Sequence, residues 1–252
     1  MTVQQILLGL GGFYVDAADF DGTNDFMARG GALTGAATGK KGIFSCWVRL
    51  DGGDGAHMSL SESNGTLGNY WQIHRDTLNV FRITLREATL GTIILNIRTT
   101  NTYTSSATWR HVLASWDLAT AGARHLYITD ASDLTVTTFT NDTIAYTSPT
   151  DSGIGSEPAG GAKLNGCLAE LYFNQAEYLD LDVTANRRKF ITASLKPTSL
   201  GADGSLPTGT APILYHRVAD GAAASTFATN LGTGGNFTIT GTLDIASTSP
   251  SD

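Results

Sequence analysis

Two carboxyl groups directed at one bond can hydrolyse a glycoside, and the acidic residues of this chain lack the spacing for that reaction. No glutamate begins a strand in which further acidic residues follow at alternate positions; the glutamates are Glu62, Glu87, Glu157, Glu170 and Glu177. Asp180 and Asp182 form a closer pair, but a helix cap explains them better. We therefore predict no catalytic carboxylate, and we expect Glu170 to be a polar group at a strand end or on the second sheet of a sandwich.

The histidines could act as general bases, yet no nucleophile stands in a suitable sequence context. The five are His57, His74, His111, His125 and His216. His111 follows Arg110 and His125 follows Arg124, both in strand-like runs. The sequence contains no Gly-x-Ser-x-Gly turn, which would present a serine to its base. We expect His111 to be a strand residue with a hydrogen-bonded ring, and we predict no catalytic residue.

Four aspartates near Gly22 could supply oxygen ligands to a hard cation such as Ca²⁺; they are Asp16, Asp19, Asp21 and Asp25. Their spacing fails the EF-hand register, because Ala17 and Ala28 occupy the first and twelfth ligand places. Aspartate is also common in turns, where its carboxylate accepts hydrogen bonds from the backbone. On spacing alone, turn formation is the better explanation.

Two glycine-rich segments fail as phosphate-binding loops. Gly35–Lys41 is one residue shorter than a Walker A loop, and Lys41 stands where Ser or Thr is required. Gly232–Gly235 precedes a predicted strand rather than a helix, so it cannot form a dinucleotide-binding turn. We predict no nucleotide cofactor.

Several aromatic side chains could stack on sugar rings; they are Tyr70, Trp71, Tyr103, Trp109 and Tyr146. Most aromatic residues of a β-sandwich belong to its core. The sequence leaves both roles open for these five residues.

These residues are distributed over short segments with alternating apolar side chains, the pattern of β-strands. The central segment is Lys163–Phe173, entered through the turn-rich run Ile154–Gly161. The odd-numbered residues from Cys167 to Phe173 should share one side, and Leu168, Glu170 and Tyr172 the other. A strand apolar on both sides fits the middle of a sandwich. Further strands are predicted at 44–50, 70–75, 78–86, 92–100, 109–117, 124–129, 134–140 and 213–218. The pattern predicts an all-β, two-sheet antiparallel sandwich.

The remaining segments define the predicted domain limits. One short helix is predicted near 182–195, with Asp182 as its N-cap and Pro197 beyond its end. Residues 237–245 should form one strand that closes the sandwich. We assign 1–19 to an N-terminal arm or lead-in strand, 20–246 to a single domain, and 247–252 to a polar tail. Residues 1–12 are apolar, so we expect them to dock on the body or on another subunit.

Composition narrows the function classes. The net charge of −7 argues against binding to the phosphate backbone of nucleic acid, and 41% hydrophobic residues exclude a disordered chain. Cys46 and Cys167 are expected to be buried free thiols, with a single cross-sheet disulfide as the alternative. We find no secretory signal and no membrane-spanning run, so we expect synthesis in a cytoplasm without an export signal and no membrane insertion.

Four segments, in this order, resemble a laminin-G-like domain of the concanavalin A-like jelly-roll superfamily. They are Phe20–Asp25, Phe44–Val48, Trp109–Val112 with Leu126–Ile128, and Ile154–Gly155 leading to Leu164–Tyr172. The family pattern has an opening Phe-Asp-Gly, a Trp-Val strand, a Trp-x-His-Val strand and a late strand with a glutamate before a short helix. The resemblance covers most of the chain, from Phe20 to Leu195, and implies a jelly-roll sandwich with a binding or adhesive role.

The resemblance also bears on chemistry. Several relatives carry a structural calcium near the first of these segments, which makes Asp21 and Asp25 candidate ligands beside their role in a turn. The glucanases of the superfamily share a Glu-x-Asp-x-(x)-Glu strand that this sequence lacks. A non-enzymatic member without a required cofactor is therefore implied.

Both ends of the chain are similar to segments of bacteriophage virion proteins, at Ile6–Gly12 and at Asn230–Gly241. On this resemblance we expect a virion structural protein, a capsid-decoration or tail module that is made in the host cytoplasm, forms a homo-oligomer and packs on other virion proteins. The alternative is a carbohydrate-binding module or adhesin for a cell-surface glycan. A glycoside hydrolase is the third hypothesis.

Overall fold

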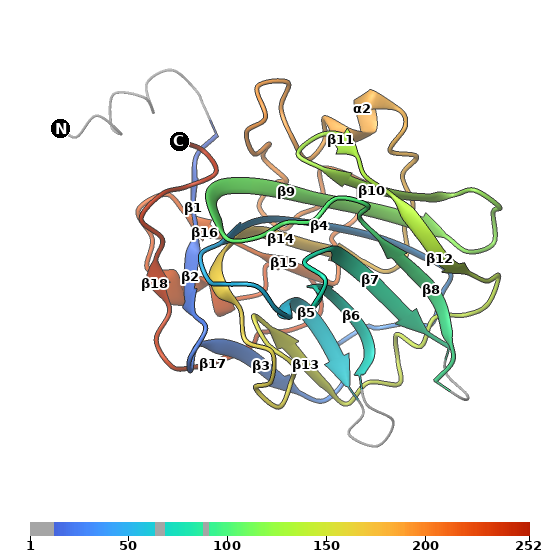
Figure 1. Ribbon diagram of the computed structural model, residues 1–252, viewed down its shortest axis with the longest axis horizontal. Helices are drawn as coiled ribbons and strands as arrows, with labels where there is room; N and C mark the ends of the chain where they lie inside the picture. The colour runs from blue at the N-terminus through green and yellow to red at the C-terminus, as the bar shows by residue number, and fades with distance from the viewer. Residues whose placement is uncertain (1–12, 64–68, 88–90) are drawn as a thin grey trace.

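The computed structural model describes residues 13–63, 69–87 and 91–252. Within these residues the chain forms two large antiparallel sheets and a small two-stranded sheet (Figure 1). The first sheet has the strand order β11-β10-β9-β4-β14-β2-β18, with β15 also paired to β14, and the second has the order β12-β8-β7-β6-β5-β13-β3-β17. The prediction of an all-β, two-sheet sandwich is confirmed.

Most of the strands follow the predicted segments closely, but β3, β5 and β13 lie outside them. The first sheet contains β2 (Ala18–Asp21), β4 (Lys41–Leu50), β9 (Ser106–Asp117), β10 (Arg124–Ile128), β11 (Ala131–Ser132), β14 (Asn165–Asn174), β15 (Leu214–His216) and β18 (Asp244–Ile245). The second contains β3 (Phe26–Gly30), β5 (His57–Ser63), β6 (Asn69–Arg75), β7 (Phe81–Arg86), β8 (Ile93–Arg98), β12 (Thr135–Phe139), β13 (Asp151–Ile154) and β17 (Thr238–Thr240). The small sheet pairs β1 (Val15–Asp16) with β16 (Val218–Ala219).

The core lies between the two large sheets and is centred on Phe173. The ring of Phe173 on β14 lies 5.0 Å from that of Trp71 on β6 and 5.9 Å from that of Tyr146. All three side chains are fully buried. Burial of large aromatic side chains supplies much of the free energy that holds two sheets together, so this contact joins the sheets at their middle.

The central strand β14 departs from the predicted alternation at Glu170. Ala169 pairs with Trp47 and Tyr172 with Ser45, so three steps along β14 match two along β4. This β-bulge puts Glu170 in the left-handed region, at φ 49°. Leu168, Leu171 and Phe173 consequently share the inner face, whereas Cys167, Ala169 and Tyr172 lie outside. The prediction that the odd-numbered residues share one side was wrong beyond the bulge.

The outer face of the first sheet is covered by residues 176–212, which we call the covering segment. Leu181, Phe190 and Leu200 pack there against β4, β9 and β14, with Ile43, Leu113 and Tyr172 as contacts. In Figure 1, α2 and its flanking loops lie on the side of the first sheet away from the second. The first sheet is therefore buried on both faces.

The helix in this segment is shorter than the prediction. α2 spans Thr184–Arg187, its N-cap position is Val183, and no side chain caps it. Asp182 instead accepts a hydrogen bond from the hydroxyl of Tyr127 at 2.7 Å. The prediction of Asp182 as N-cap was wrong, because a tertiary contact with β10 holds its carboxylate.

The predicted closing strand at 237–245 is two strands in different sheets. β17 pairs with β3 in the second sheet, and β18 pairs with β2 in the first. Gly241, at φ 80°, allows the turn between them. Residues 247–252 then pack on β1, where Val15 donates its N–H to Ser251 Oγ at 3.1 Å and Tyr14 donates its hydroxyl to Asp252 at 2.6 Å.

The two cysteines are free thiols, as predicted, and they lie on opposite faces of the first sheet. Cys46 belongs to the central core and Cys167 to the outer face. A disulfide between them would have to pass through the sheet. Residues 1–12, predicted to dock on the body or on another subunit, lie outside the described part of the chain. In that part, no helix has the length and apolar character needed to cross a membrane.

Candidate functional site

The outer face of the second sheet differs from that of the first, because it is polar and carries no hydrophobic cluster among the described residues. On β6 and β7, Ile73, Phe81 and Ile83 point into the core. Successive side chains of a strand point to opposite faces, so His74, Arg82 and Thr84 point outward. The alternation on β8 places Asn96 and Arg98 on the same face, since Leu95 and Ile97 are in the core.

Strand register aligns these outward residues into two rows across four strands. We call the first the charged row; it consists of His74 on β6, Arg82 on β7, Arg98 on β8 and Thr135 on β12. We call the second the neutral row; it consists of Gln72, Thr84, Asn96 and Thr138 on the same four strands. Each row spans about 14 Å, three inter-strand gaps of about 4.8 Å, and the rows lie about 7 Å apart along the strands.

The charged row contains one ion pair. Arg82 Nη2 lies 2.7 Å from Asp76 Oδ2 at the β6–β7 turn. Burial lowers the pKa of His74 to about 4, so its ring is neutral at pH 7. The positive charge of the row therefore comes from Arg82 and Arg98.

Three polar atoms of the two rows are buried without a hydrogen-bond partner: His74 Nδ1, Arg82 Nε and Asn96 Oδ1. Buried polar groups are usually paired, and leaving one unpaired costs about 1–3 kcal/mol. All three atoms are shielded from solvent, so a ligand on this face contacts the exposed atoms of the rows and reaches these three only if their side chains turn outward.

Glu170 lies on the other side of the molecule, under the covering segment. Its Oε2 accepts a hydrogen bond from Tyr215 at 2.8 Å, and Arg217 Nε lies 3.5 Å from its Oε1. Burial raises the pKa of Glu170 to about 7. Glu170 is thus a buried polar residue at the bulge in the middle of β14, not at a strand end or on the second sheet as predicted. Among the described residues, no second carboxylate forms a hydrogen bond or ion pair at the same point.

His111 also meets the prediction, since its Nε2 lies 2.8 Å from Ser45 Oγ on β4. The pair is buried, and the ring stacks on Trp47 with centroids 4.8 Å apart. Burial lowers the pKa of His111 to about 3, and its Nδ1 has no partner. A hydrolytic triad needs an acid at that nitrogen and an accessible serine, and this arrangement supplies neither.

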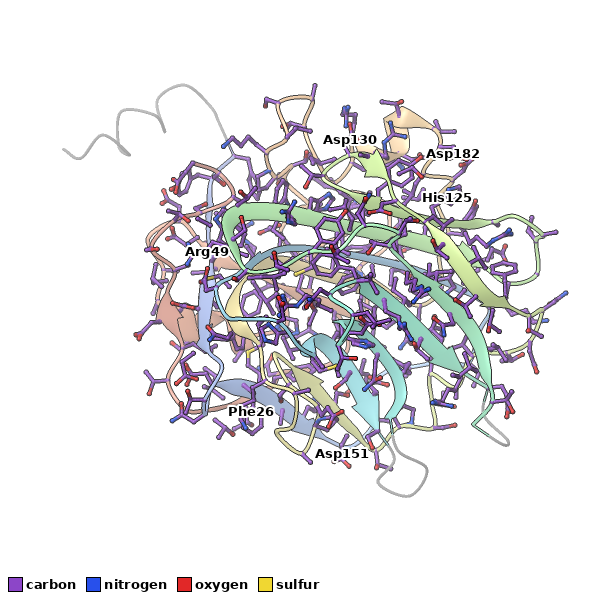
Figure 2. All side chains as sticks on the ribbon, viewed as in Figure 1. Phe26, Arg49, His125, Asp130, Asp151 and Asp182 are labelled. Atoms are coloured by element: carbon purple, nitrogen blue, oxygen red, sulfur yellow. The ribbon has the colours of Figure 1, made fainter. Side chains whose placement is uncertain are left out.

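His125 lies in a mixed cluster beneath the covering segment. Its Nε2 lies 2.8 Å from the Tyr178 hydroxyl and 3.5 Å from Asp180, and its Nδ1 lies 3.5 Å from Asp182. Figure 2 shows His125, Asp130 and Asp182 at the end of the molecule near α2, with Arg49 on the other side. A second cluster joins Cys167, Asp19 and Asp51. Both clusters are held by internal hydrogen bonds.

Asp21 and Asp25, the candidate calcium ligands, form hydrogen bonds within a turn. Asp21 Oδ1 accepts the backbone N–H groups of Thr23, Asn24 and Asp25. Asp25 Oδ1 accepts the N–H of Thr242 at 2.8 Å. Among the described residues, no third carboxylate, imidazole or thiol joins them at metal-ligand spacing. These contacts match the turn-forming role.

The aromatic candidates for sugar stacking are mostly core residues. Trp71, Tyr103 and Tyr146 are buried, and Trp109 is half-buried with its Nε1 donating to Thr248. The Tyr70 side chain is outside the described part of the structure. Gly35–Lys41, rejected as a phosphate loop, borders a cleft of about 590 Å³ that Asp117 and Gln175 also line.

The two rows were not predicted from the sequence. Their signal was present in the polar residues that alternate with apolar ones at 70–75, 78–86 and 92–100. That alternation predicted strands, but not which strands are neighbours or which face stays uncovered. Both depend on the complete sheet order.

Comparison with known proteins agrees with this architecture. Residues 31–177, more than half of the chain, match the family model Laminin_G_3, described as the concanavalin A-like lectin/glucanases superfamily. Among curated proteins, no sequence matches this chain. A solved structure from Bacteroides ovatus ATCC 8483, of a protein to which carbohydrate binding is ascribed, has a TM-score of 0.65 at 12% identity. The alignment covers 94% of this chain and 62% of that protein, so the chain spans less than two thirds of its length.

Two further structures are less similar. A heptameric SAP-like pentraxin from Limulus polyphemus has a TM-score of 0.46 at 13% identity, over 66% of this chain and 78% of that one. The CBM40 of the Ruminococcus gnavus IT-sialidase has a TM-score of 0.44 at 10% identity, over 62% and 94%. The family match and the sandwich together identify the chain as a member of the Laminin_G_3 family in the concanavalin A-like lectin/glucanases superfamily.

Proposed function

We propose that this chain is a non-catalytic carbohydrate-binding module and that the outer face of the second sheet binds the glycan. The observation that carries the proposal is the alignment of two polar rows across β6, β7, β8 and β12. Sugars present hydroxyl groups that both donate and accept hydrogen bonds, and amide and hydroxyl side chains can do the same. The neutral row offers two amides and the Thr138 hydroxyl over about 14 Å, a length suited to a short oligosaccharide, and Thr84 is buried between them.

The burial of the outer face of the first sheet also favours the second sheet as the glycan-binding face. The covering segment buries its outer side under apolar contacts, so a ligand cannot reach it without displacing a packed cluster. The fold shared with the Bacteroides ovatus protein, to which carbohydrate binding is ascribed, supports the ligand class. The family match also favours the carbohydrate-binding alternative over the virion role.

The virion role, with its partners, oligomeric state and location, remains a prediction from the two ends of the chain. Residues 1–12 are outside the described part, and Asn230–Gly241 contributes β17 to the second sheet as any sandwich strand would. The proposal also includes one domain over 20–246. One core cluster joins residues from Phe20 to Leu243, which supports a single domain, and Ala18 of the predicted lead-in segment belongs to the same cluster.

A glycan array followed by calorimetric titration tests the proposal. The double variant Gln72→Ala/Asn96→Ala removes both amides of the neutral row. Each neutral hydrogen bond contributes about 0.5–1.5 kcal/mol, so we expect binding to weaken by about 5- to 150-fold. The matched control is Asn24→Ala, which removes an exposed amide at the β2–β3 turn and should leave affinity unchanged. Absence of binding to every arrayed glycan, or equal affinity in the double variant, would contradict the proposal.

A further inference from the structure

Arg82 and Arg98 face each other directly across β7 and β8. Like charges at opposed positions of an antiparallel pair destabilise the sheet. His74 is opposed to Arg82 on the other side, so three nitrogen-bearing side chains follow one another across three strands. The fold keeps this arrangement although the whole chain carries a net charge of −7.

The positive charge of the row is only partly compensated. Asp76 pairs with Arg82, but no described residue forms a hydrogen bond or an ion pair with Arg98. Asp76 also accepts the N–H groups of Leu78 and Val80, so its carboxylate is held at the β6–β7 turn and is not free to move toward β8. One uncompensated guanidinium therefore remains on the polar face, at the end of β8.

The groups around Arg98 are arranged to receive an anion. The guanidinium fork donates several N–H bonds in one plane and matches the geometry of a carboxylate or sulfate. His74 Nδ1 and Arg82 Nε are buried without partners in the same row. His74 is buried and neutral at pH 7, so it adds no charge to the row. The neutral row beside it presents groups suited to sugar hydroxyls.

We propose that the charged row makes this face selective for anionic oligosaccharides, with a carboxylate or sulfate of the sugar bound between Arg82 and Arg98. The inference rests on the glycan-binding function proposed above. The bound anion would relieve the repulsion between the two arginines. The adjoining sugar ring would lie over the neutral row, so that one face of the protein binds both the charged group and the hydroxyl groups of the oligosaccharide.

Titration with three matched ligands tests the selectivity: lactose, sialylated lactose and sulfated lactose. We expect at least one anionic ligand to bind about tenfold or more tightly than lactose, since hydrogen bonds between charged groups are about twice as strong as neutral ones. The carboxylate and sulfate arms identify which anion is preferred. Raising the salt concentration from 50 to 500 mM should weaken the anionic ligands more than lactose.

Variants of Arg98 test whether this residue causes the preference for the anionic ligand. Arg98→Gln should remove the preference for the anionic ligand, and Arg98→Lys, which keeps the charge without the fork, should restore part of it. The matched control is Lys196→Gln, which removes one positive charge from the covering segment and should leave the preference unchanged. The melting temperature of Arg98→Gln should equal or exceed that of the wild type, because a like-charge contact is removed.

The outcomes separate the two proposals. Equal affinity for all three ligands, with no effect of Arg98→Gln, would overturn the selectivity and leave glycan binding intact. Failure of all three ligands and of every arrayed glycan would overturn both. Equally tight binding of a short single-stranded oligonucleotide would also refute the inference, because it would show attraction to any polyanion. A lower melting temperature of Arg98→Gln would assign Arg98 a structural role instead.

Discussion

Asp76 Oδ2 lies 2.7 Å from Arg82 Nη2, and this ion pair is the only one that the structure shows within the charged row or at its border, among the described residues. It holds Arg82 at the β6–β7 turn and cancels part of the positive charge of the row. We therefore expect the Asp76 carboxylate to stabilise the fold and, at the same time, to weaken the binding of an anion to this row.

Replacing this carboxylate should separate those effects. In Asp76→Asn, the amide oxygen can still accept the N–H of Leu78, but the ion pair is lost. We expect a loss of stability of about 1 kcal/mol or less and a severalfold gain in affinity for the anionic ligand. The measurements are chemical unfolding and titration calorimetry. The control is Asp203→Asn, which makes the same change in a turn of the covering segment; an equal gain there would contradict the local explanation.

Ser45 and His111 should act in stability and not in catalysis. Ser45→Ala removes the one hydrogen-bond partner that the described residues provide for the His111 ring and leaves a buried nitrogen unpaired, which costs about 1–3 kcal/mol. Glycan affinity should not change, since the pair lies beneath the covering segment. The wild-type protein should also fail to react with a fluorophosphonate probe. Covalent labelling of Ser45 would reverse this conclusion.

Acidification should destabilise the protein through its buried histidines. Burial lowers the pKa values of His74 and His216 to about 4 and that of His111 to about 3, and partial burial lowers the pKa of His57 to about 4. Below pH 6.5 the unfolded chain binds protons that the native state does not, so stability falls as the pH is lowered from about 6.5 to 4. A fully buried histidine shifted by two pH units contributes about 2–3 kcal/mol to this loss.

Unfolding titrations at pH 7 and pH 4.5 measure that loss. His74→Gln should show a smaller loss than the wild type, because one titrating group is absent. Equal losses in both proteins would show that His74 is not buried in its neutral form.

Glu170 should produce the opposite pH dependence. Its pKa of about 7 in the native state exceeds the ordinary value of 4.5, so the native state binds more protons between these values. Its contribution to stability is therefore present at pH 4.5 and is lost as the pH rises through 7. Relative to the wild type, Glu170→Gln should gain up to about 3 kcal/mol between pH 5 and 8.5. A constant difference between the two proteins would refute the shift.

The two thiols should be inaccessible in the native protein. Cys46 and Cys167 are both buried, and burial raises the pKa of each thiol far above its usual range. We expect a thiol reagent to modify neither residue until the protein unfolds, after which both react. A reducing agent should leave the melting temperature unchanged. Rapid modification of the native protein would contradict the burial of the outer-face thiol, Cys167.

Much of the fold could be predicted because side chains alternate along a strand, so a strand with one face in the core has an apolar residue at every second position. A strand was predicted at 78–86, and its alternate residues Phe81, Ile83 and Leu85 all lie in the core. The same reasoning failed at Glu170, since a single inserted residue reverses every side chain beyond it. It failed again at Asp182, where a tertiary hydrogen bond replaced a local cap. The single closing strand became two because Gly241 carries the chain from one sheet to the other.

The sequence by itself determined that this chain is an all-β, two-sheet sandwich, because local alternation and residue type are enough to predict the strands. The tertiary structure decided that Cys46 and Cys167 lie on opposite faces of one sheet and that most of the candidate aromatic residues are buried. Only the tertiary structure decided that His74, Arg82 and Arg98 share one row and that their face stays open. Strand neighbours and register arise from contacts between residues far apart in the chain, and local patterns do not encode those contacts.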